Sequence, residues 1–485
     1  MDRRKFLAGM STAAVAPIVC SPLGAAMQGH GGMAGMGDGQ GGVKAAPTMG
    51  PPLCGKADHT LRIEPCKLEI APGVTVETTA FNGQVPGPML QLKKGVRTTI
   101  DVVNATDVED LTHWHGLHTD VRNDGAMEQG APMIRPGETF RYTLTPEPSG
   151  TRWYHTHNTA GDNLNLGGYS GQFGFLTVDG GPSLGDYDQE HYLAFHHWMP
   201  HFVPMVMQMQ NISANRPVST GSDVAYRHAT VNAHCLGAGE PLRVRKGQRI
   251  MLHLLNASAT ENVVVALPGH KFKVMALDGN PVPNPRVVDT LSIAVAERVD
   301  CIVEMDNPGV WILGSTLPEV REMGLGIVIE YADAKGAAVW RDVPTVPWDY
   351  RQFASDAAAP VPDGIFNLQF VDVGTKNGSM FDTWTINGKS WPDVDPLRVE
   401  QGKRYRMLFH NLSGDQHPMH LHRHSFEVVA IDDKPMSGLI KDTVNVLPYQ
   451  RVAVDFIADK PGDTIYHCHM QLHMDHGFLG IIKYV

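Results

Sequence analysis

The stretch LQLKKGVRTTIDVVN at residues 90–104 recurs in pattern as LRVRKGQRIMLHLLN at residues 242–256 and as LRVEQGKRYRMLFHN at residues 397–411. All three copies keep a leucine, a glycine, an arginine and a closing asparagine in register, and they begin 152 and 155 residues apart. Apolar residues alternate with polar ones around the glycine, which predicts two strands joined by a turn. A unit that recurs three times at this spacing indicates three β domains of one kind.

A second landmark recurs later in each unit. A Ser-Gly or Pro-Gly turn at residues 149–150, 308–309 and 461–462 precedes a further strand. The 485 residues include 50 Gly and 34 Pro, and 42% of them are hydrophobic, which suits many turns and several cores. We therefore expect an all-β chain of three β-sandwich domains, at residues 56–185, 186–345 and 346–485.

The N-terminus is typical of an export signal. Arg3-Arg4-Lys5-Phe6-Leu7 forms a twin-arginine segment, and residues 8–26 carry no charge. Pro17 and Pro22 argue against a membrane anchor, and no other segment is long enough to span a bilayer. This predicts a Tat-type signal at residues 1–26, cleaved near Ala25–Ala26, export by the Tat machinery and a periplasmic or secreted protein. Residues 27–55 are rich in Gly and Met and predict a flexible segment.

Charge and cysteine content restrict the partners and the cross-links. The net charge of −11 argues against nucleic acid, because phosphate binding needs a basic surface. Sequence alone defines no oligomeric state. In an oxidising compartment, two disulfides could form among four cysteines in any of three pairings, or the cysteines could remain free thiols. These four are Cys54, Cys66, Cys235 and Cys301.

Histidines occupy matched positions in the outer two units. At nine and eleven residues beyond the shared asparagine, and again at five and seven beyond the shared turn glycine, the first and third units carry His-x-His pairs. Residues two apart on a strand point to one face, about 6.6–6.8 Å apart, so four such pairs can converge on a metal cluster between two domains. The pairs are His113 and His115, His155 and His157, His420 and His422, and His467 and His469; the middle unit has Val265, Leu267, Gly314 and Thr316 instead.

A cysteine stands between the last two of these histidines. Cys468 points to the opposite face of its strand, and with His417 and His473 it makes a His₂Cys set, the ligand chemistry of a blue-copper electron-transfer centre. A zinc site is the alternative for such a set, but zinc needs no second cluster of eight histidines and performs no redox chemistry. The arrangement therefore predicts a one-electron acceptor directly beside a multi-metal site.

Four motifs together resemble the copper signatures of multicopper oxidases, the laccase-like enzymes. They are HWHG at 113–116, WYHTH at 153–157, HPMHLH at 417–422 and HCHMQLH at 467–473. The resemblance implies three cupredoxin-like Greek-key domains and four copper ions. By motif position it implies a type 1 copper held by His417, Cys468 and His473, a type 2 copper held by His113 and His420, and a type 3 pair held by His115, His155, His157, His422, His467 and His469.

The axial position of the type 1 site departs from the common pattern. Ten residues after the cysteine stands Phe478, which cannot ligate copper, so the site should be three-coordinate and its potential high. Met474 or Met470 could approach the copper instead, although neither occupies the axial position, and Phe478 also fits a packing role.

The family resemblance also implies a proton path. Asp124 matches an acidic position near the cluster of similar bacterial enzymes, although a surface turn before Gly125 would explain it equally well. Some bacterial relatives carry a Glu directly after the second type 1 histidine. Here that residue is Met474, and Asp475 is a candidate replacement.

The expected function is one-electron oxidation of a donor at the type 1 copper, with electron transfer from Cys468 to His467 and His469 and reduction of dioxygen to water. Phenols and aromatic amines, as for a laccase, are the first hypothesis for the donor. The alternative is a cuprous or other metal-ion oxidase serving copper tolerance, because thioethers suit Cu(I). A non-enzymatic copper-binding scaffold is a third hypothesis, and the complete set of copper ligands argues against it. The candidate Cu(I) ligands are Met205, Met207 and Met209 and, near the N-terminus, Met27, Met33, Met36 and Met49 with His30.

Overall fold

We describe a computed structural model of the chain, which covers residues 55–204, 221–344, 346–376 and 378–485. The expected signal at 1–26, the Gly- and Met-rich segment up to residue 54 with Cys54, and the methionines at 205, 207 and 209 lie outside the described residues. Within them, the regular structure is almost entirely β. No helix in the described part is long and apolar enough to cross a membrane.

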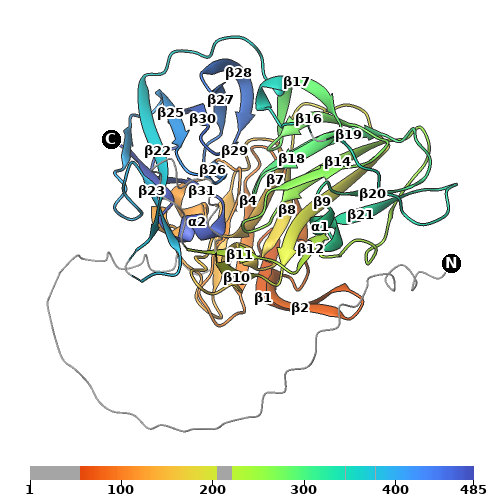
Figure 1. The fold of residues 1–485 in the computed structure, drawn as a ribbon. Coiled ribbons are helices and arrows are strands. Elements are labelled where there is room, and N and C mark those ends of the chain that lie inside the picture. The colour runs from red at the N-terminus through yellow and green to blue at the C-terminus, as the bar shows by residue number, and fades with distance from the viewer. Residues whose placement is uncertain (1–54, 205–220, 345, 377) are drawn as a thin grey trace, which may run out of the picture. The chain divides into compact units, whose positions relative to one another are not determined.

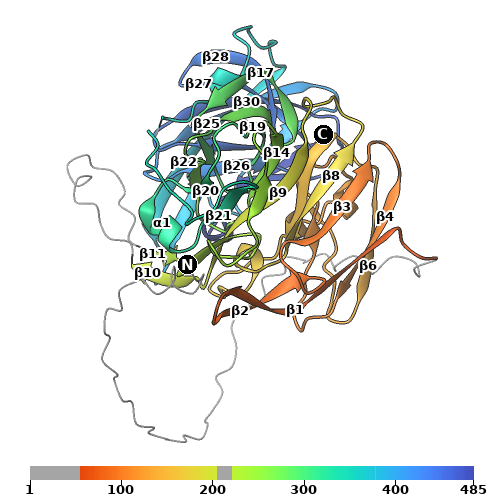
Figure 2. The same ribbon diagram turned by 90° about the vertical axis from the view of Figure 1, so that its right-hand side faces the viewer.

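The first repeat forms two four-stranded sheets, with the strand orders β2-β1-β4-β6 and β3-β8-β7-β5. Figure 2 shows β1, β4 and β6 in one and β3 and β8 in the other. The strands are β1 (His59–Ala71), β2 (Val74–Phe81), β3 (Gly87–Lys93), β4 (Thr98–Asn104), β5 (Thr112–His113), β6 (Thr139–Leu144), β7 (Gly150–Thr156) and β8 (Phe173–Asp179).

The second repeat forms a six-stranded and a five-stranded sheet, with the orders β12-β9-β14-β19-β16-β17 and β13-β21-β20-β15-β18, and a hairpin of β10 and β11. The elements are β9 (Gln189–Trp198), β10 (His201–Pro204), β11 (Ser222–Ala225), β12 (His228–Val231), β13 (Leu242–Val244), β14 (Arg249–Asn256), β15 (Val263–Ala266), β16 (Phe272–Leu277), β17 (Asn280–Val288), β18 (Thr290–Ile293), β19 (Arg298–Glu304), β20 (Val310–Ser315), α1 (Pro318–Glu322) and β21 (Gly326–Tyr331).

The third repeat has the same plan, with the orders β23-β22-β25-β30-β27-β28 and β24-β32-β31-β26-β29 (blue in Figure 1). The elements are β22 (Gly364–Thr375), β23 (Asp382–Ile386), β24 (Leu397–Val399), β25 (Arg404–Asn411), β26 (His417–Leu421), β27 (Phe426–Ile431), β28 (Lys434–Lys441), β29 (Thr443–Val446), β30 (Arg451–Ile457), β31 (Thr464–Cys468), α2 (Gln471–Asp475) and β32 (Leu479–Tyr484).

The recurring stretch links the two sheets of each repeat. Its first strand (β3, β13 or β24) lies in one sheet and its second strand (β4, β14 or β25) in the other. The turn between them needs a left-handed residue, and the shared Gly95, Gly247 and Gly402 have φ of +72°, +85° and +84°. In each repeat the second strand also pairs in parallel with the first strand of its own sheet, β1, β9 or β22. The all-β fold class with three cupredoxin-like sandwiches is confirmed.

The domain boundaries stay predictions. The one proposed at 185/186 falls between β8 and β9, and the one at 345/346 falls between β21 and β22. One apolar core fills the first sandwich, whereas a single larger core runs through the second and third.

The shared asparagine explains how each repeat shapes the loop that follows. Asn104, Asn256 and Asn411 are fully buried at the ends of their strands. Each side-chain amide donates to main-chain oxygens of the next loop, and each side-chain oxygen accepts from the residue two positions on. Because buried polar groups need partners, this residue fixes the start of the loop, which in the two outer repeats leads to the first histidine pair.

Candidate metal centres

The eight histidines of the four pairs come together between the first and third repeats. On adjacent strands of the first repeat, His113 of β5 pairs directly with His155 of β7. The same pairing occurs in the third repeat, where His420 of β26 pairs with His467 of β31. The second member of each pair lies just beyond its strand, at His115, His157, His422 and His469. Seven of the eight are buried and His469 is half-buried.

The ring nitrogens form three groups of metal-binding size. Within each group, one nitrogen per ring lies within 4.8 Å of the others. The first group is His113, His115 and His420; the second is His115, His155 and His469; the third is His157, His422 and His467. Each group mixes the two outer repeats, so neither repeat could complete one alone.

Main-chain carbonyls fix the orientation of four of these eight rings. Nδ1 of His113 donates to the Asp124 oxygen at 2.8 Å, and Nδ1 of His420 donates to the Asp442 oxygen at 2.7 Å. His155 and His467 donate in the same way to their neighbouring residues' carbonyls. A carbonyl only accepts, so the proton sits on Nδ1 and Nε2 is left with a free lone pair.

His115 is turned the other way. Its Nε2 lies 3.0 Å from Oδ1 of Asp442 and 3.2 Å from the Thr443 hydroxyl. Its Nδ1 is buried with no hydrogen-bond partner among the described residues, as are Nε2 of His155 and Nε2 of His469. Those three histidines make up the second group.

These unpartnered nitrogens fit bound metal ions. Across the other groups, Nε2 atoms face one another, at 3.4 Å between His113 and His420 and at 3.1 Å between His422 and His467. Burial holds the pKa of His422 and His467 well below the usual value, so the rings are neutral. Buried lone pairs without donors are costly, and imidazole nitrogens suit copper.

The cysteine site lies on the other face of β31, inside the core of the third repeat. Sγ of Cys468 is 3.8 Å from Nδ1 of His417 and 3.5 Å from Nδ1 of His473, and the two Nδ1 atoms are 3.2 Å apart. His417 lies on β26 and His473 on α2, and Nε2 of His417 lies 2.8 Å from the Ser413 hydroxyl. The set is therefore assembled with both nitrogens turned toward the sulfur.

Aromatic side chains enclose this site. Phe478 is fully buried, with its ring centre 4.7 Å from that of His417. Trp384 lies 4.1 Å from the His473 ring, centre to centre. Met474 packs instead with Ile465 and Leu479, in a cluster that does not contain the cysteine.

Asp124 is buried beside two of the histidines. Its Oδ2 accepts from Nδ1 of His422 at 2.7 Å and from Nε2 of Gln129 at 2.5 Å, and it lies 3.5 Å from Nδ1 of His113. The surface-turn interpretation therefore does not hold, because the side chain is inaccessible to solvent. Its part in proton delivery stays a prediction.

Asp475 does not contact the cluster histidines in the described structure. Its Oδ2 accepts from the main-chain nitrogens of Ala160 and Gly161, and its Oδ1 accepts from Gln471, so it ties α2 to a loop of the first repeat. Burial raises the pKa of Asp475 to about 6.

Sequence reasoning missed two carboxylates at the cluster. Oε2 of Glu128 is buried with no hydrogen-bond partner in the part of the chain that the structure describes, 3.7 Å from Nδ1 of His157, and no sequence pattern marks it. Asp442, in contrast, could have been found from the sequence. Asp289-Thr290 and Asp442-Thr443 each stand nine residues ahead of a matched arginine, Arg298 or Arg451, so the position recurs in the repeat.

The cysteines outside the metal site are free thiols where the structure describes them. Cys66, Cys235 and Cys301 form no disulfide with one another. Cys54 lies outside the described residues.

Family models place the chain. Three models of multicopper oxidase domains match residues 62–183, 213–324 and 367–484. The chain belongs to the multicopper oxidase family. The resemblance inferred from the four motifs is thereby confirmed, and the protein is a copper-dependent oxidoreductase.

Individual multicopper oxidases are similar over most of the chain. Multicopper oxidase MmcO of Mycobacterium tuberculosis is 29% identical over 455 residues, covering 88% of this chain and 86% of the relative. Laccase-2 of Botryotinia fuckeliana is 27% identical over 475 residues, covering 84% and 78%. The solved structure of a multicopper oxidase from Campylobacter jejuni, described as a metallo-oxidase, has a TM-score of 0.67 at 20% identity and covers 91% of this chain and 94% of that one, a likeness of fold.

Proposed function

We propose that this oxidase takes electrons one at a time at the His417–Cys468–His473 site and delivers four of them to dioxygen, which is reduced to water at the eight-histidine cluster. The observation that carries the proposal is the single strand end at which Cys468 is flanked by His467 and His469. The cysteine enters one site and its covalent neighbours enter the other, so only peptide bonds separate the two.

The proposal assigns four copper ions. A type 1 copper would lie between Cys468, His417 and His473, and a type 2 copper between His113 and His420. The two type 3 coppers would take the second and third histidine groups, His115, His155 and His469, and His157, His422 and His467; the unpartnered nitrogens of these groups support that division. Bound copper supplies one-electron redox chemistry at the first site and dioxygen reduction at the others.

The protein residues have three further tasks. Phe478 and Trp384 keep water from the cysteine site, which favours a high potential. A cavity lined by His155, His157 and His469, among others, gives dioxygen a place beside the type 3 ligands. Asp124 would hold the His422 ring and supply a proton path. An Asp124→Asn variant should then be reduced by donor at the normal rate but reoxidised by dioxygen roughly 10- to 100-fold more slowly. Equal reoxidation rates would exclude this role.

Phenols and aromatic amines are the proposed electron donors. They need only a route for electrons to a histidine edge, and His473 is the more exposed of the two type 1 histidines, at 6%. The similarity to a protein named Laccase-2 supports this choice.

Cu(I) is the second candidate donor, because carboxylates gather near the cysteine site. Asp415 lies two residues after Ser413, whose hydroxyl contacts His417, and the main-chain nitrogen of Asp415 donates to that hydroxyl. Burial, and then repulsion from Asp223 and Asp382, raises the pKa of Asp415 to about 6, and the combined charge of these acids would attract a cation. The similarity in fold to a structure described as a metallo-oxidase supports this candidate.

Substitutions separate the two donors. We would measure kcat/KM for Cu(I) and for a phenol in Asp223→Asn and in a variant with Met205, Met207 and Met209 replaced by Leu. A Cu(I) donor predicts that only the Cu(I) value falls. If Cu(I) oxidation survives both changes, the carboxylates and methionines do not bind the donor.

The chain would perform this reaction outside the cytoplasm, after Tat export directed by residues 1–26. Replacing Arg3 and Arg4 by Lys should leave the protein inside cells, as followed by fractionation.

Spectra test the copper assignment. The copper-loaded protein should absorb at about 600 nm from a thiolate–Cu(II) site, and Cys468→Ser should lose that band while it keeps the type 2 signal in electron paramagnetic resonance (EPR) spectra. Absence of the band from the loaded parent protein would overturn the proposed function.

A further inference from the structure

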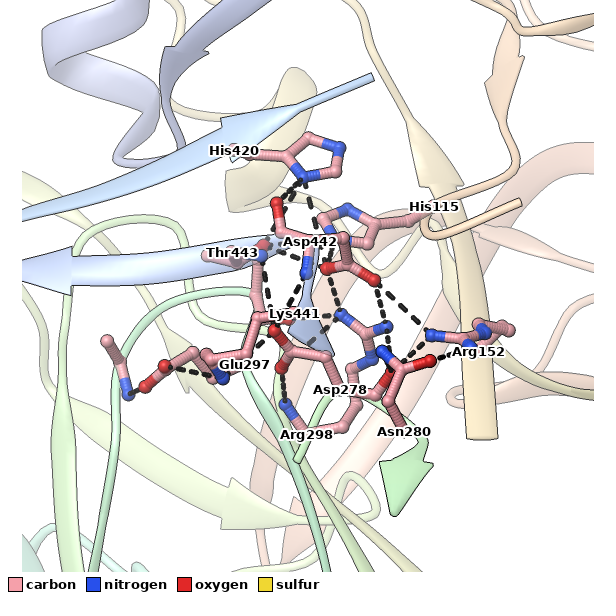
Figure 3. A network of polar contacts seen from close by, with 12 residues as sticks. His115, Arg152, Asp278, Asn280, Glu297, Arg298, His420, Lys441, Asp442 and Thr443 are labelled. Atoms are coloured by element: carbon pink, nitrogen blue, oxygen red, sulfur yellow. Dashed lines mark hydrogen bonds and ion pairs between the residues drawn. The ribbon is translucent and has the colours of Figure 1, made fainter. Parts of the chain in front are cut away.

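A buried network of charged side chains lies beside the cluster, where all three repeats meet (Figure 3). Arg152 comes from the first repeat, Asp278 and Arg298 from the second, and Lys441 and Asp442 from the third. All five side chains are fully buried. The ligand-free middle repeat therefore supplies charges at the edge of a centre whose ligands it does not provide.

Asp442 is the member that touches the histidines. Its Oδ1 accepts from Nε2 of His115 at 3.0 Å, and its main-chain oxygen accepts from Nδ1 of His420 at 2.7 Å. These two rings are assigned above to different copper ions. One residue thus fixes the orientation of ligands to two of the three cluster metals.

Arg298 holds Asp442 through a two-pronged contact. Its two terminal nitrogens donate to Oδ1 at 2.7 Å and to Oδ2 at 2.6 Å. The same guanidinium donates to the main-chain oxygens of Ala296 and Asp278, at 3.1 and 3.2 Å. The carboxylate is therefore set in one plane by a group that is itself anchored in the middle repeat.

The anchor is rigid because the repeats pack closely there. Asp278 Oδ2 forms an ion pair with Nζ of Lys441 at 2.9 Å and accepts a hydrogen bond from the main-chain nitrogen of Thr443 at 3.1 Å. On the other side, a Cβ on Gly150 of the first repeat would come within 1.9 Å of the Gly279 oxygen. No side chain fits at that contact, so the turn after Asp278 is clamped between the outer repeats.

We propose that Asp442 and Arg298 are positioning residues, through which the middle repeat sets the orientation of His115 and His420. This inference rests on the proposed copper assignment. His115 lies beyond the end of β5, where strand geometry no longer directs its ring. The acceptor on Nε2 leaves Nδ1 as the unpartnered nitrogen of this ring among the described residues, which is the reverse of the rings whose Nδ1 donates to a carbonyl. Such partners of metal-binding histidines fix the tautomer and raise the basicity of the ligand atom.

The test compares three variants of the full-length, copper-loaded protein. Asp442→Asn removes the charge from the acceptor, and Arg298→Lys keeps the charge but loses the two-pronged contact. Asp455→Asn is the matched control, because Asp455 of the same repeat is also a buried carboxylate that holds two arginines, Arg404 and Arg406, and it contacts no cluster histidine in the described structure.

The readouts are the type 2 EPR spectrum, the absorbance at about 600 nm, and the chelator concentration that removes half of the copper. In Asp442→Asn and Arg298→Lys we expect an altered type 2 spectrum and cluster copper lost at a roughly 10- to 100-fold lower chelator concentration, with the blue band retained. In Asp455→Asn the type 2 spectrum should match that of the parent.

Several results would overturn the inference. Parental type 2 spectra and chelator resistance in both variants would do so, and so would equal changes in Asp455→Asn. If Asp442→Asn does not fold, Arg298→Lys decides the outcome alone. A parent protein without a blue band and a type 2 signal would instead overturn the proposed function, and this inference with it.

Discussion

Phe478 offers the sharpest test at the scale of single residues. Its ring centre lies 4.7 Å from that of His417 and 4.8 Å from that of Phe370. Phe478→Met would add a weak axial thioether that favours Cu(II), so the type 1 potential should fall, whereas Phe478→Leu adds no ligand and should leave the potential near the parental value. Redox titration of the blue absorbance measures both. Each change should cost about 1–2 kcal/mol of packing. A potential that falls equally in both variants would contradict the axial argument.

Single residues also mark the limit of what sequence could predict. The metal-binding histidines could be predicted from the sequence, because strand alternation and the repeat register place His113 opposite His155 and His420 opposite His467. The reversed ring of His115 could not be predicted, because the carboxylate that orients it, on Asp442, lies 327 residues away along the chain. Long-range hydrogen bonds leave no periodic trace in a single sequence.

At the scale of elements, the turn after Asp124 holds the short strand β5 in place. Gly125 has a φ of +78°, and a Cβ there would come within 1.8 Å of the Thr112 oxygen. Gly125→Ala should therefore displace β5 with His113 and cost more than about 2 kcal/mol of unfolding free energy. Gly137→Ala is the control, because Gly137 has the same φ of +78° and a Cβ there would meet no atom of the described residues within 4 Å, so it should cost about 1 kcal/mol. Thermal unfolding compares them, and equal losses would show that β5 is not clamped.

A second element-scale prediction concerns the central strand β14. His253 on β14 contacts Asp300 of β19 at 2.7 Å and Glu190 of β9 at 2.9 Å, and it also faces the Thr151 hydroxyl of β7 at 2.9 Å. Burial alone would lower the pKa of His253, but the two carboxylates raise it to about 9. Because the folded pKa exceeds the unfolded value of 6.5, the stabilisation is complete below about pH 6.5 and is lost as pH rises through about 9.

The protonated His253 contributes about 3 kcal/mol to the free energy of unfolding, because its folded pKa of about 9 lies above the unfolded value of 6.5. His253→Gln keeps hydrogen bonding without the charge, so its melting temperature should fall less than that of the parent between about pH 6.5 and 10. The copper-free protein is used for both, so that metal binding does not add its own pH dependence. Parallel curves for the two proteins would rule out a protonated His253 in the folded state.

For the whole molecule, the repeat predicted the three sandwiches and the absence of ligands from the middle one, but not what the middle one contributes. Sequence comparison within the chain assigned residues 186–345 no chemistry, because Val265, Leu267, Gly314 and Thr316 replace the histidines. The structure gives that repeat two roles visible only after folding. It shares a core with the third repeat, and its Arg298 reaches the edge of the cluster.

Copper removal should therefore destabilise the outer repeats more than the middle one. Each histidine group draws ligands from the first and third repeats, so bound metal links them and stabilises the folded state by about 4 kcal/mol where free copper is 1,000-fold above its dissociation constant. Chelation should lower the melting temperature and, by hydrogen exchange, reduce protection in β5, β7, β26 and β31 while β14 and β19 keep theirs. Cys468→Ser, which spares the cluster ligands, should lose much less protection in β5 and β7. A uniform loss across all three repeats would mean that the cluster stabilises the molecule as one unit, contrary to this prediction.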